Sequence, residues 1–369
     1  MIYQSKNKVK KKLLATLLLI LVSLLVNVMY AQFKGLRQSY ARVWYPAFSS
    51  VQRMVTGWCP FSLGDVLYLI AGVLILFYCI RLLKAIGAFR KDKWKIASLL
   101  LQGINILIGI YLIFLIFWAL NYRNHRVERE FSISPAKYST TDLVQLSQWL
   151  RTNVNQYHRL VTGSPMDSTV LQLGPDQVFK ESRQCYQLTT ADYPGLTYQF
   201  ASIKPTMFGY LMNYLGVSGY YNPFTGEAQV NTTIPEILQP FVCCHEIAHQ
   251  IGFAPEEAAN FVGYVAAMHS HDPAYRYSAN FDLMLYALGE LRFRDSNAEK
   301  EIWTSLDTGV KKDYRTVLAF YHNFSNPIDP LISRMYDKYL RANHEKLGIE
   351  SYNEVISLLI QYYRRLPAN

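Results

Sequence analysis

Three long apolar stretches within the first 122 residues constrain the fold of this chain more than any other feature. They contain almost no charged side chains and cover residues 13–30, about 66–80 and 96–122. A helix needs about 20 apolar residues to cross about 30 Å of hydrocarbon. Three such stretches with cationic flanks are typical of a membrane protein and not of a soluble core. We therefore predict transmembrane helices over about 13–30, 64–84 and 97–121.

The net charge of +10 is unevenly distributed along the chain. Residues 1–121 contain 15 lysines and arginines and only two acids, a net of +13, whereas residues 122–369 have a net charge of −3. The basic residues of the first part flank the apolar stretches, where they set membrane topology and can contact anionic headgroups. The sequence thus indicates the lipid bilayer as a partner and no nucleic acid.

The same basic residues predict the orientation. Five lysines precede the first stretch and six basic residues separate the second from the third, whereas the longer 31–63 loop has four. Short loops rich in Lys and Arg stay in the cytoplasm, so we expect a cytoplasmic N-terminus and an extracytoplasmic chain after Tyr122. The first stretch also fits a secretory signal peptide, but its apolar length favours an uncleaved anchor.

The region after the third stretch is expected to be mainly helical. Apolar residues recur at three and four positions in 143–159, 282–293, 314–322, 331–344 and 352–363. Residues 218–233 are the exception, because alternating residues around two turn dipeptides predict a β-hairpin. We therefore predict a mainly α protein, with a membrane region (1–122) followed by one helix-rich extracytoplasmic domain (123–369) that contains a small hairpin or sheet.

The cysteines indicate no disulfide framework. Cys79 lies in the second apolar stretch, and Cys243 and Cys244 are adjacent in sequence. Only Cys59 and Cys185 remain as a conceivable bridge, and nothing in the pattern requires one.

The sequence contains an H-E-x-x-H motif, His245-Glu246-Ile247-Ala248-His249, whose side chains can bind a metal ion. Residues i and i+4 lie on one face of a helix, so both imidazoles can bind a single ion with Glu246 beside it. Two imidazoles suit Zn²⁺, which takes three protein ligands in a hydrolytic site and leaves one position open for water. We therefore expect one catalytic zinc.

The residues after the motif supply a third ligand. Gly252 can end the motif helix in a left-handed turn, and Pro255 begins a second helix with acids in its first turn. Glu256 is the predicted ligand, because it stands one turn before Asn260, which could hold a ligand in place by a hydrogen bond. Glu257 remains the alternative, one position further along.

This segment resembles the gluzincin metallopeptidases, in which a glutamate of a following helix completes the H-E-x-x-H site, often as E-x-x-x-[DN]. Over nearly its whole length the chain looks like a family of uncharacterised bacterial membrane proteins (domain of unknown function 3810). The shared motifs are PFSLGD at 60–65, LNY at 120–122, SGYYNPFTGEA at 218–228, HEIAHQIGF at 245–253, and Glu256 with ANF at 259–261. The family pattern has a further acidic residue where this chain has Ala258. This difference removes one possible metal ligand and leaves Glu256 and Glu257 as the candidates for the third ligand.

The likeness implies a zincin-like domain at a bacterial inner (cytoplasmic) membrane, periplasmic or extracellular. A zinc held by His245, His249 and Glu256 would lower the pKa of its bound water toward ~7. Glu246 would act as general base and pass the proton to the leaving amine. An oxyanion donor is also needed, and Tyr336, His344 and Tyr352 are possible without any being assigned.

These features predict a membrane-anchored zinc-dependent metallopeptidase that hydrolyses amide bonds of a peptide or protein substrate. An intramembrane protease is disfavoured, because the motif has polar flanks, among them Glu236 and Gln250, that are costly in hydrocarbon. The alternative is a non-catalytic membrane scaffold or sensor that retains a zinc site, since metal binding is not turnover.

Overall fold

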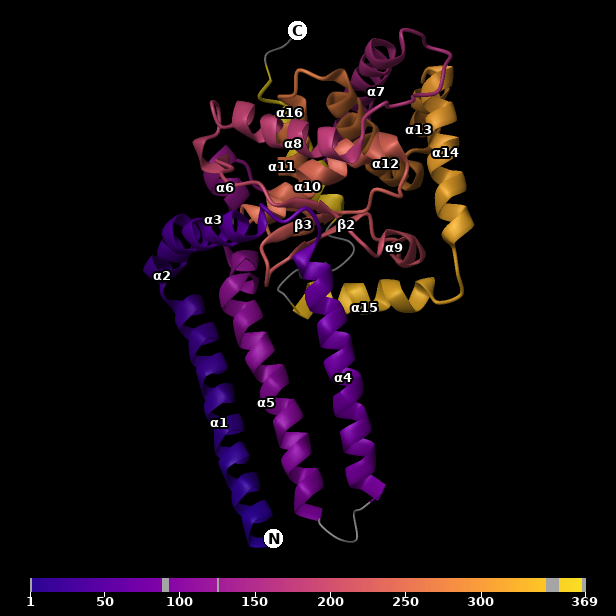
Figure 1. Ribbon diagram of the computed structural model, residues 1–369. Helices are drawn as coiled ribbons and strands as arrows, with labels where there is room; N and C mark the ends of the chain where they lie inside the picture. Colours follow the sequence, from indigo (N-terminus) through magenta and orange to yellow (C-terminus); the bar gives the residue numbers. More distant parts are fainter. Residues whose placement is uncertain (1, 88–92, 125, 343–351, 367–369) are drawn as a thin grey trace. The chain divides into compact units, whose positions relative to one another are not determined.

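The computed structural model describes residues 2–87, 93–124, 126–342 and 352–366 (Figure 1). The chain divides into two compact units. The first comprises residues 1–48, 63–120 and 223–225, and the second comprises 49–62, 121–222 and 226–369. The unit that contains the H-E-x-x-H motif therefore also includes a short segment from between the first two apolar stretches.

The first unit contains three helices that are long and apolar enough to cross a membrane, α1 (Ile2–Gln32), α4 (Leu63–Gly87) and α5 (Lys93–Phe117). They match the three predicted spans and fit a membrane-anchored protein. Each helix is longer than its apolar stretch, because the flanking lysines are good helix formers that extend it. Large apolar side chains cover their surfaces; in α4, for example, the apolar window has no buried residue.

Aromatic side chains gather at the C-terminal ends of α1 and α5. The Tyr40 hydroxyl donates to the Ile116 carbonyl at 3.0 Å, the Tyr40 and Trp44 rings stack at 5.3 Å, and Phe48 and Phe117 lie 4.3 Å apart between centroids. None of the helices predicted from sequence covers residues 31–63, but α2 (Lys34–Ser39), a π-helix (Tyr40–Trp44) and α3 (Tyr45–Thr56) follow one another here. Such aromatic clusters are typical of the level at which a span leaves the hydrocarbon.

A small three-stranded sheet lies in the second unit, with strand order β1-β3-β2. The antiparallel pair β2 (Gly219–Asn222) and β3 (Glu227–Val230) confirms the predicted hairpin. β1 (Ile203–Pro205) adds to β3 in parallel. The sequence did not predict β1, because three residues are too few to establish an alternating pattern.

Helices make up most of the second unit and pack around α10, α11 and α12 (Figure 1). All five segments with helical periodicity are helical, although residues 343 and 344 lie outside the described residues. The helices that contain 282–293 and 314–322 begin nine and six residues before these segments, at Pro273 and Thr308. Gly163 ends α7 with a φ of 68°, and a capping box of Ser139 and Asp142 begins it. The helices of this unit are α6 (Arg126–Phe131), α7 (Thr140–Thr162), α8 (Pro175–Thr189), α9 (Gly209–Leu215), α10 (Gln239–Gln250), α11 (Glu256–Met268), α12 (Pro273–Arg294), α13 (Ser296–Thr304), α14 (Thr308–Phe324), α15 (Asp329–Ala342) and α16 (Tyr352–Tyr363).

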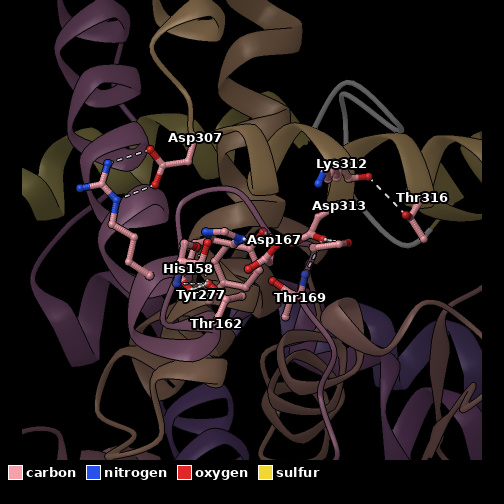
Figure 2. A network of polar contacts seen from close by, with 12 residues as sticks. His158, Thr162, Asp167, Thr169, Tyr277, Asp307, Lys312, Asp313 and Thr316 are labelled. Atoms are coloured by element: carbon pink, nitrogen blue, oxygen red, sulfur yellow. Dashed lines mark hydrogen bonds and ion pairs between the residues drawn. The ribbon is translucent and has the colours of Figure 1, made fainter.

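A buried polar network fixes the loop after α7 (Figure 2). The Asp313 carboxylate accepts from the Tyr277 hydroxyl at 2.6 Å and from the Thr169 backbone N–H at 2.8 Å. His158 lies 2.9 Å from the Asp167 carbonyl, so α7, α12 and α14 share one set of contacts. We assign this network a structural role, since these hydrogen bonds tie the loop to α12 and α14.

All five cysteines are free, including Cys59 and Cys185. Four of them are buried and Cys79 is exposed on α4. The expected absence of a disulfide framework therefore matches the described thiols.

Candidate metal centre

The helix that carries the motif, α10, is held from several sides. The Tyr186 hydroxyl of α8 donates to the Cys244 carbonyl at 2.6 Å, and the Phe241 backbone N–H donates to the Ser278 hydroxyl of α12 at 3.1 Å. Gln250, at its last position, donates to the carbonyls of Ser202 and Gly226 at 2.8 Å each. These hydrogen bonds hold α10 in place without a contribution from a metal ion.

A glycine allows α11 to cross α10 closely. A Cβ atom at Gly263 would lie 2.9 Å from the His245 backbone nitrogen and 3.0 Å from its Cα. These are backbone atoms, which cannot move aside as a flexible side chain can. Only glycine fits, and the close crossing brings the first turn of α11 toward the two histidines.

The structure places Glu256 against both histidines of the motif. Its Oε2 lies 3.3 Å from His245 Nε2, and its Oε1 lies 3.7 Å from His249 Nε2. One ligand atom from each of the three residues lies within 4.8 Å of the others. Glu257 is not part of this cluster of described residues.

Hydrogen bonds on the far side of each imidazole orient the rings. His245 Nδ1 lies 2.8 Å from Asn260 Oδ1, and His249 Nδ1 lies 2.7 Å from the Phe253 carbonyl oxygen. Both partners are acceptors, so each Nδ1 carries a proton, and each ring in its neutral form would present the Nε2 lone pair to the cluster. We expected Asn260 to hold a metal ligand in place, and in the structure it contacts His245, one of the three candidate ligands.

The three residues fit a zinc ion. With Zn–N and Zn–O distances of 2.0–2.2 Å, two ligand atoms of a tetrahedral site are about 3.4 Å apart. The observed Nε2–O separations of 3.3 and 3.7 Å are close to this value. Two neutral imidazoles and one carboxylate leave a fourth position for water, as a hydrolytic site requires.

The cluster is charged in the absence of a metal. Burial works to lower the pKa of His249, but the hydrogen bond and charge of Glu256 outweigh it and raise this pKa to about 9. Burial in turn works to raise the pKa of Glu256, but hydrogen bonds from His245 and His249 hold it well below its ordinary value. Without metal, the site is an ion pair of a protonated histidine and a carboxylate.

Glu246 lies beside the cluster and is 3% exposed. Burial raises the pKa of its carboxyl to about 7, with His245 and His249 lowering it and Glu256 raising it. A Cβ atom at Gly219 of β2 would lie only 2.7 Å from Glu246 Oε1. The strand backbone therefore packs directly against this carboxylate.

Of the three residues considered as oxyanion donors, Tyr336 lies at the cluster. Its hydroxyl donates to Glu256 Oε1 at 2.8 Å from α15. His344 lies outside the described residues, and so does the side chain of Tyr352. The sequence also missed Asp282 of α12, whose pKa burial raises to about 6 while His245 lowers it. No sequence pattern marked Asp282, because only the packing of α12 brings it near the motif.

Two guanidinium groups bind the carbonyls at the C-terminal end of α10. Arg53 Nη1 and the Ser49 hydroxyl donate to the Gln250 carbonyl at 3.1 and 2.6 Å. Arg126 Nη1 donates to the Ile251 carbonyl. The last carbonyls of a helix have no partner within it and carry partial negative charge, so cations are favoured there. No sequence pattern predicted these contacts, because both arginines are far from the motif along the chain.

The fold and the site together define a mainly α-helical chain with three apolar helices and a candidate His₂Glu metal centre. The chain belongs to the family described as protein of unknown function (DUF3810), whose model matches residues 40–360. No curated protein and no solved structure matches the chain.

Proposed function

We propose that this chain is a membrane-anchored zinc-dependent metallopeptidase of the gluzincin type, which hydrolyses amide bonds of a peptide or protein substrate. The observation that carries the proposal is the cluster of His245, His249 and Glu256 with the buried Glu246 beside it. These residues have the types and separations that metal-assisted hydrolysis requires.

His245, His249 and Glu256 would hold the zinc ion. When bound, the ion would supply Lewis acidity, which polarises a carbonyl and makes water a stronger nucleophile near pH 7. Asn260 and the Phe253 carbonyl keep both imidazoles in the tautomer that binds metal.

Glu246 would act as the general base. Its carboxylate is not part of the ligand cluster, and a pKa of about 7 suits a group that accepts a proton from water and returns it to the leaving amine. Gly219 fixes the position of this carboxylate from the other side. The Tyr336 hydroxyl donates to Glu256 Oε1 and would support this ligand; to donate to a developing oxyanion it would first have to give up that bond.

The metal domain would lie on the extracytoplasmic side of a bacterial inner membrane. Residues 49–62 belong to the same compact unit as residues 121–222 and 226–369, and two apolar helices separate them from these in sequence. Two crossings return the chain to the side it left, so α4 and α5 fit as a transmembrane hairpin. The lysine-rich flanks favour the outer side. A reporter active only outside the cytoplasm, fused after Asn124, should give signal; a silent fusion would reverse the orientation.

The deciding experiment compares the full-length wild type with Glu246→Gln in lipid nanodiscs. Zinc content is measured by mass spectrometry and amide hydrolysis with a quenched peptide library. We expect one zinc in both proteins and hydrolysis lowered roughly 10²–10⁴-fold in the variant, the usual contribution of such a proton transfer. Glu257→Gln is the matched control and should retain both properties.

Two outcomes would contradict this proposal. A wild type without zinc would exclude the metal centre. A Glu246→Gln protein that retains full hydrolysis would exclude Glu246 as the base. If neither protein hydrolyses any peptide and both restore a strain lacking the native protein, the scaffold function would hold instead.

A further inference from the structure

The segment from Val51 to Phe61 exposes a row of large apolar side chains. Trp58 is 78% exposed, and four further side chains are about half exposed: Val51, Met54, Val55 and Phe61. Exposed apolar residues are common when they occur singly. Five within eleven residues, one of them a tryptophan, form a continuous feature that we call the 51–61 face.

Polar contacts on the opposite side of the segment fix the direction of this face. Arg53 is 2% exposed and its Nε donates to the carbonyls of Gln199 and Phe200 at 3.2 and 3.1 Å. The Thr56 and Ser202 hydroxyls lie 2.8 Å apart. A rotation that buried the 51–61 face would break these bonds and leave a guanidinium without partners, at a cost of a few kcal/mol. The apolar side chains therefore stay on the outside of the second unit.

We propose that the 51–61 face lies in the headgroup and upper acyl region of the lipid bilayer. Trp58 precedes Leu63, the first residue of the α4 span, by five residues. Five residues extend at most about 17 Å, so Trp58 cannot leave the vicinity of the membrane surface. Aliphatic side chains near the end of α3, with a tryptophan directly after that helix, have the composition of an interfacial element.

Charge supports lipid as the occupant over a second protein. Residues 31–63 contain three lysines and arginines besides the buried Arg53, and no aspartate or glutamate. A segment without acids suits the negative surface of a bilayer rich in anionic lipid. The aromatic cluster of Tyr40 and Trp44 precedes the face directly in sequence and has the composition of the same interface.

This placement has a consequence for the metal helix. The segment that would lie on lipid with one side binds the Gln250 carbonyl, at the end of α10, with the other. The end of α10 would then be about one helix diameter, ~10 Å, from the bilayer surface. Peptide segments close to the membrane surface could then reach the candidate metal centre on α10.

Spin labelling of the full-length protein tests this inference. Cys79→Ser removes the exposed native thiol, while the other four are buried. Labels at Val55→Cys and, as a second position, Met54→Cys are measured by power saturation in nanodiscs of anionic and zwitterionic lipid with one chain per disc. Phe293→Cys, at a position 90% exposed on α12, is the control in water.

We expect oxygen to relax both labels on the face at least several-fold more than a water-soluble nickel reagent does, and the control to show the reverse. Labels on the face that are as accessible to nickel as the control would overturn the inference. So would labels that are protected only when two chains share a disc, because the occupant would then be a second copy of the chain. Neither result depends on hydrolysis, so the inference can fail while the proposed peptidase function stands.

Discussion

Asn260 and His245 are linked by a 2.8 Å contact between Oδ1 and Nδ1 across the crossing of α11 and α10. The two helices are thereby joined twice at the cluster, because α11 also contributes Glu256 from one turn earlier. The carboxamide oxygen requires a proton on Nδ1 and so leaves the Nε2 lone pair available. One helix thus provides both a carboxylate for the cluster and the group that orients a histidine of the other helix.

Replacing Asn260 should therefore weaken metal binding without unfolding the domain. We expect Asn260→Leu to lower zinc affinity roughly 10–100-fold, the usual effect of losing such a partner. Competition with a fluorescent chelator measures the affinity. Asn260→Asp keeps an acceptor at the same position and should lose much less. Equal affinities in all three proteins would show that His245 needs no partner.

A methyl group at Gly219 should displace the Glu246 carboxylate, the proposed general base, and leave zinc binding unchanged. In Gly219→Ala the new Cβ would lie 2.7 Å from Glu246 Oε1 and 3.0 Å from the Gln229 carbonyl, so the carboxylate must move. We expect hydrolysis to fall about 10–100-fold, as for a displacement of about 1 Å at a reacting group, with zinc content unchanged. Gly289→Ala on α12, where a Cβ meets nothing within 4 Å, is the control and should leave both properties intact.

Zinc should displace a proton when it binds. The pKa of His249 is raised to about 9 by Glu256, so at pH 8 the metal-free histidine is largely protonated, and zinc requires the neutral imidazole. Calorimetric titration at pH 8 in two buffers with different ionisation enthalpies should show release of about one proton, which decreases toward zero above pH 10. Identical apparent enthalpies in the two buffers at pH 8 would contradict the ion pair.

The same pair predicts how the stability of the metal-free protein depends on pH. A folded pKa raised from 6.5 to about 9 contributes stability that is complete below pH 6.5 and is lost as pH rises through 9. The lowered pKa of Glu256 contributes stability that is present above its ordinary 4.5 and is lost in more acidic solution. Thermal unfolding of the metal-free protein should therefore show that the pair stabilises it most between about pH 4.5 and 6.5. This dependence should be weaker in His249→Gln.

Removing the guanidinium group of Arg53 should destabilise the metal helix from its C-terminal end. Arg53→Ala leaves the carbonyls of Gln250, Gln199 and Phe200 without this donor. The Gln250 carbonyl keeps the Ser49 hydroxyl as a donor, but the loss of a hydrogen bond from a charged group costs about 1.5–3 kcal/mol, so we expect a clear decrease in melting temperature and in zinc retention. Arg53→Lys restores the charge but not the shape and should recover part of the loss. Arg42→Ala, in the first unit, is the control for loss of a positive charge.

Much of the fold was predictable because the patterns that define it are local. The apolar lengths of α1, α4 and α5, the alternation of residues 218–233 and the i, i+4 spacing of His245 and His249 are all properties of short windows. The choice of Glu256 depended on a helix start that Pro255 and Gly252 mark in sequence. Gly252 has a φ of 98°, as expected for the turn that ends α10.

The features that escaped prediction are contacts over long sequence separations. Arg53 lies 197 residues from Gln250, and Gly219 is a single glycine in a short strand whose packing against Glu246 follows from the sheet alone. No periodicity encodes such pairs, because they arise only when separate elements pack. The inclusion of residues 49–62 in the unit of the motif is of the same kind.

The two apolar helices α4 and α5 interrupt the unit that contains the candidate metal centre instead of being attached to one end of it. Residues 49–62, 121–222 and 226–369 form this unit, with α4 and α5 inserted after residue 62 in the chain. A single proteolytic cut beyond α5 would leave Arg53, with its bonds to Gln250, on the membrane fragment. If α4 and α5 cross a membrane, a chain built in this way could not be shed as an intact soluble form, and the proposed hydrolysis would be confined to that membrane.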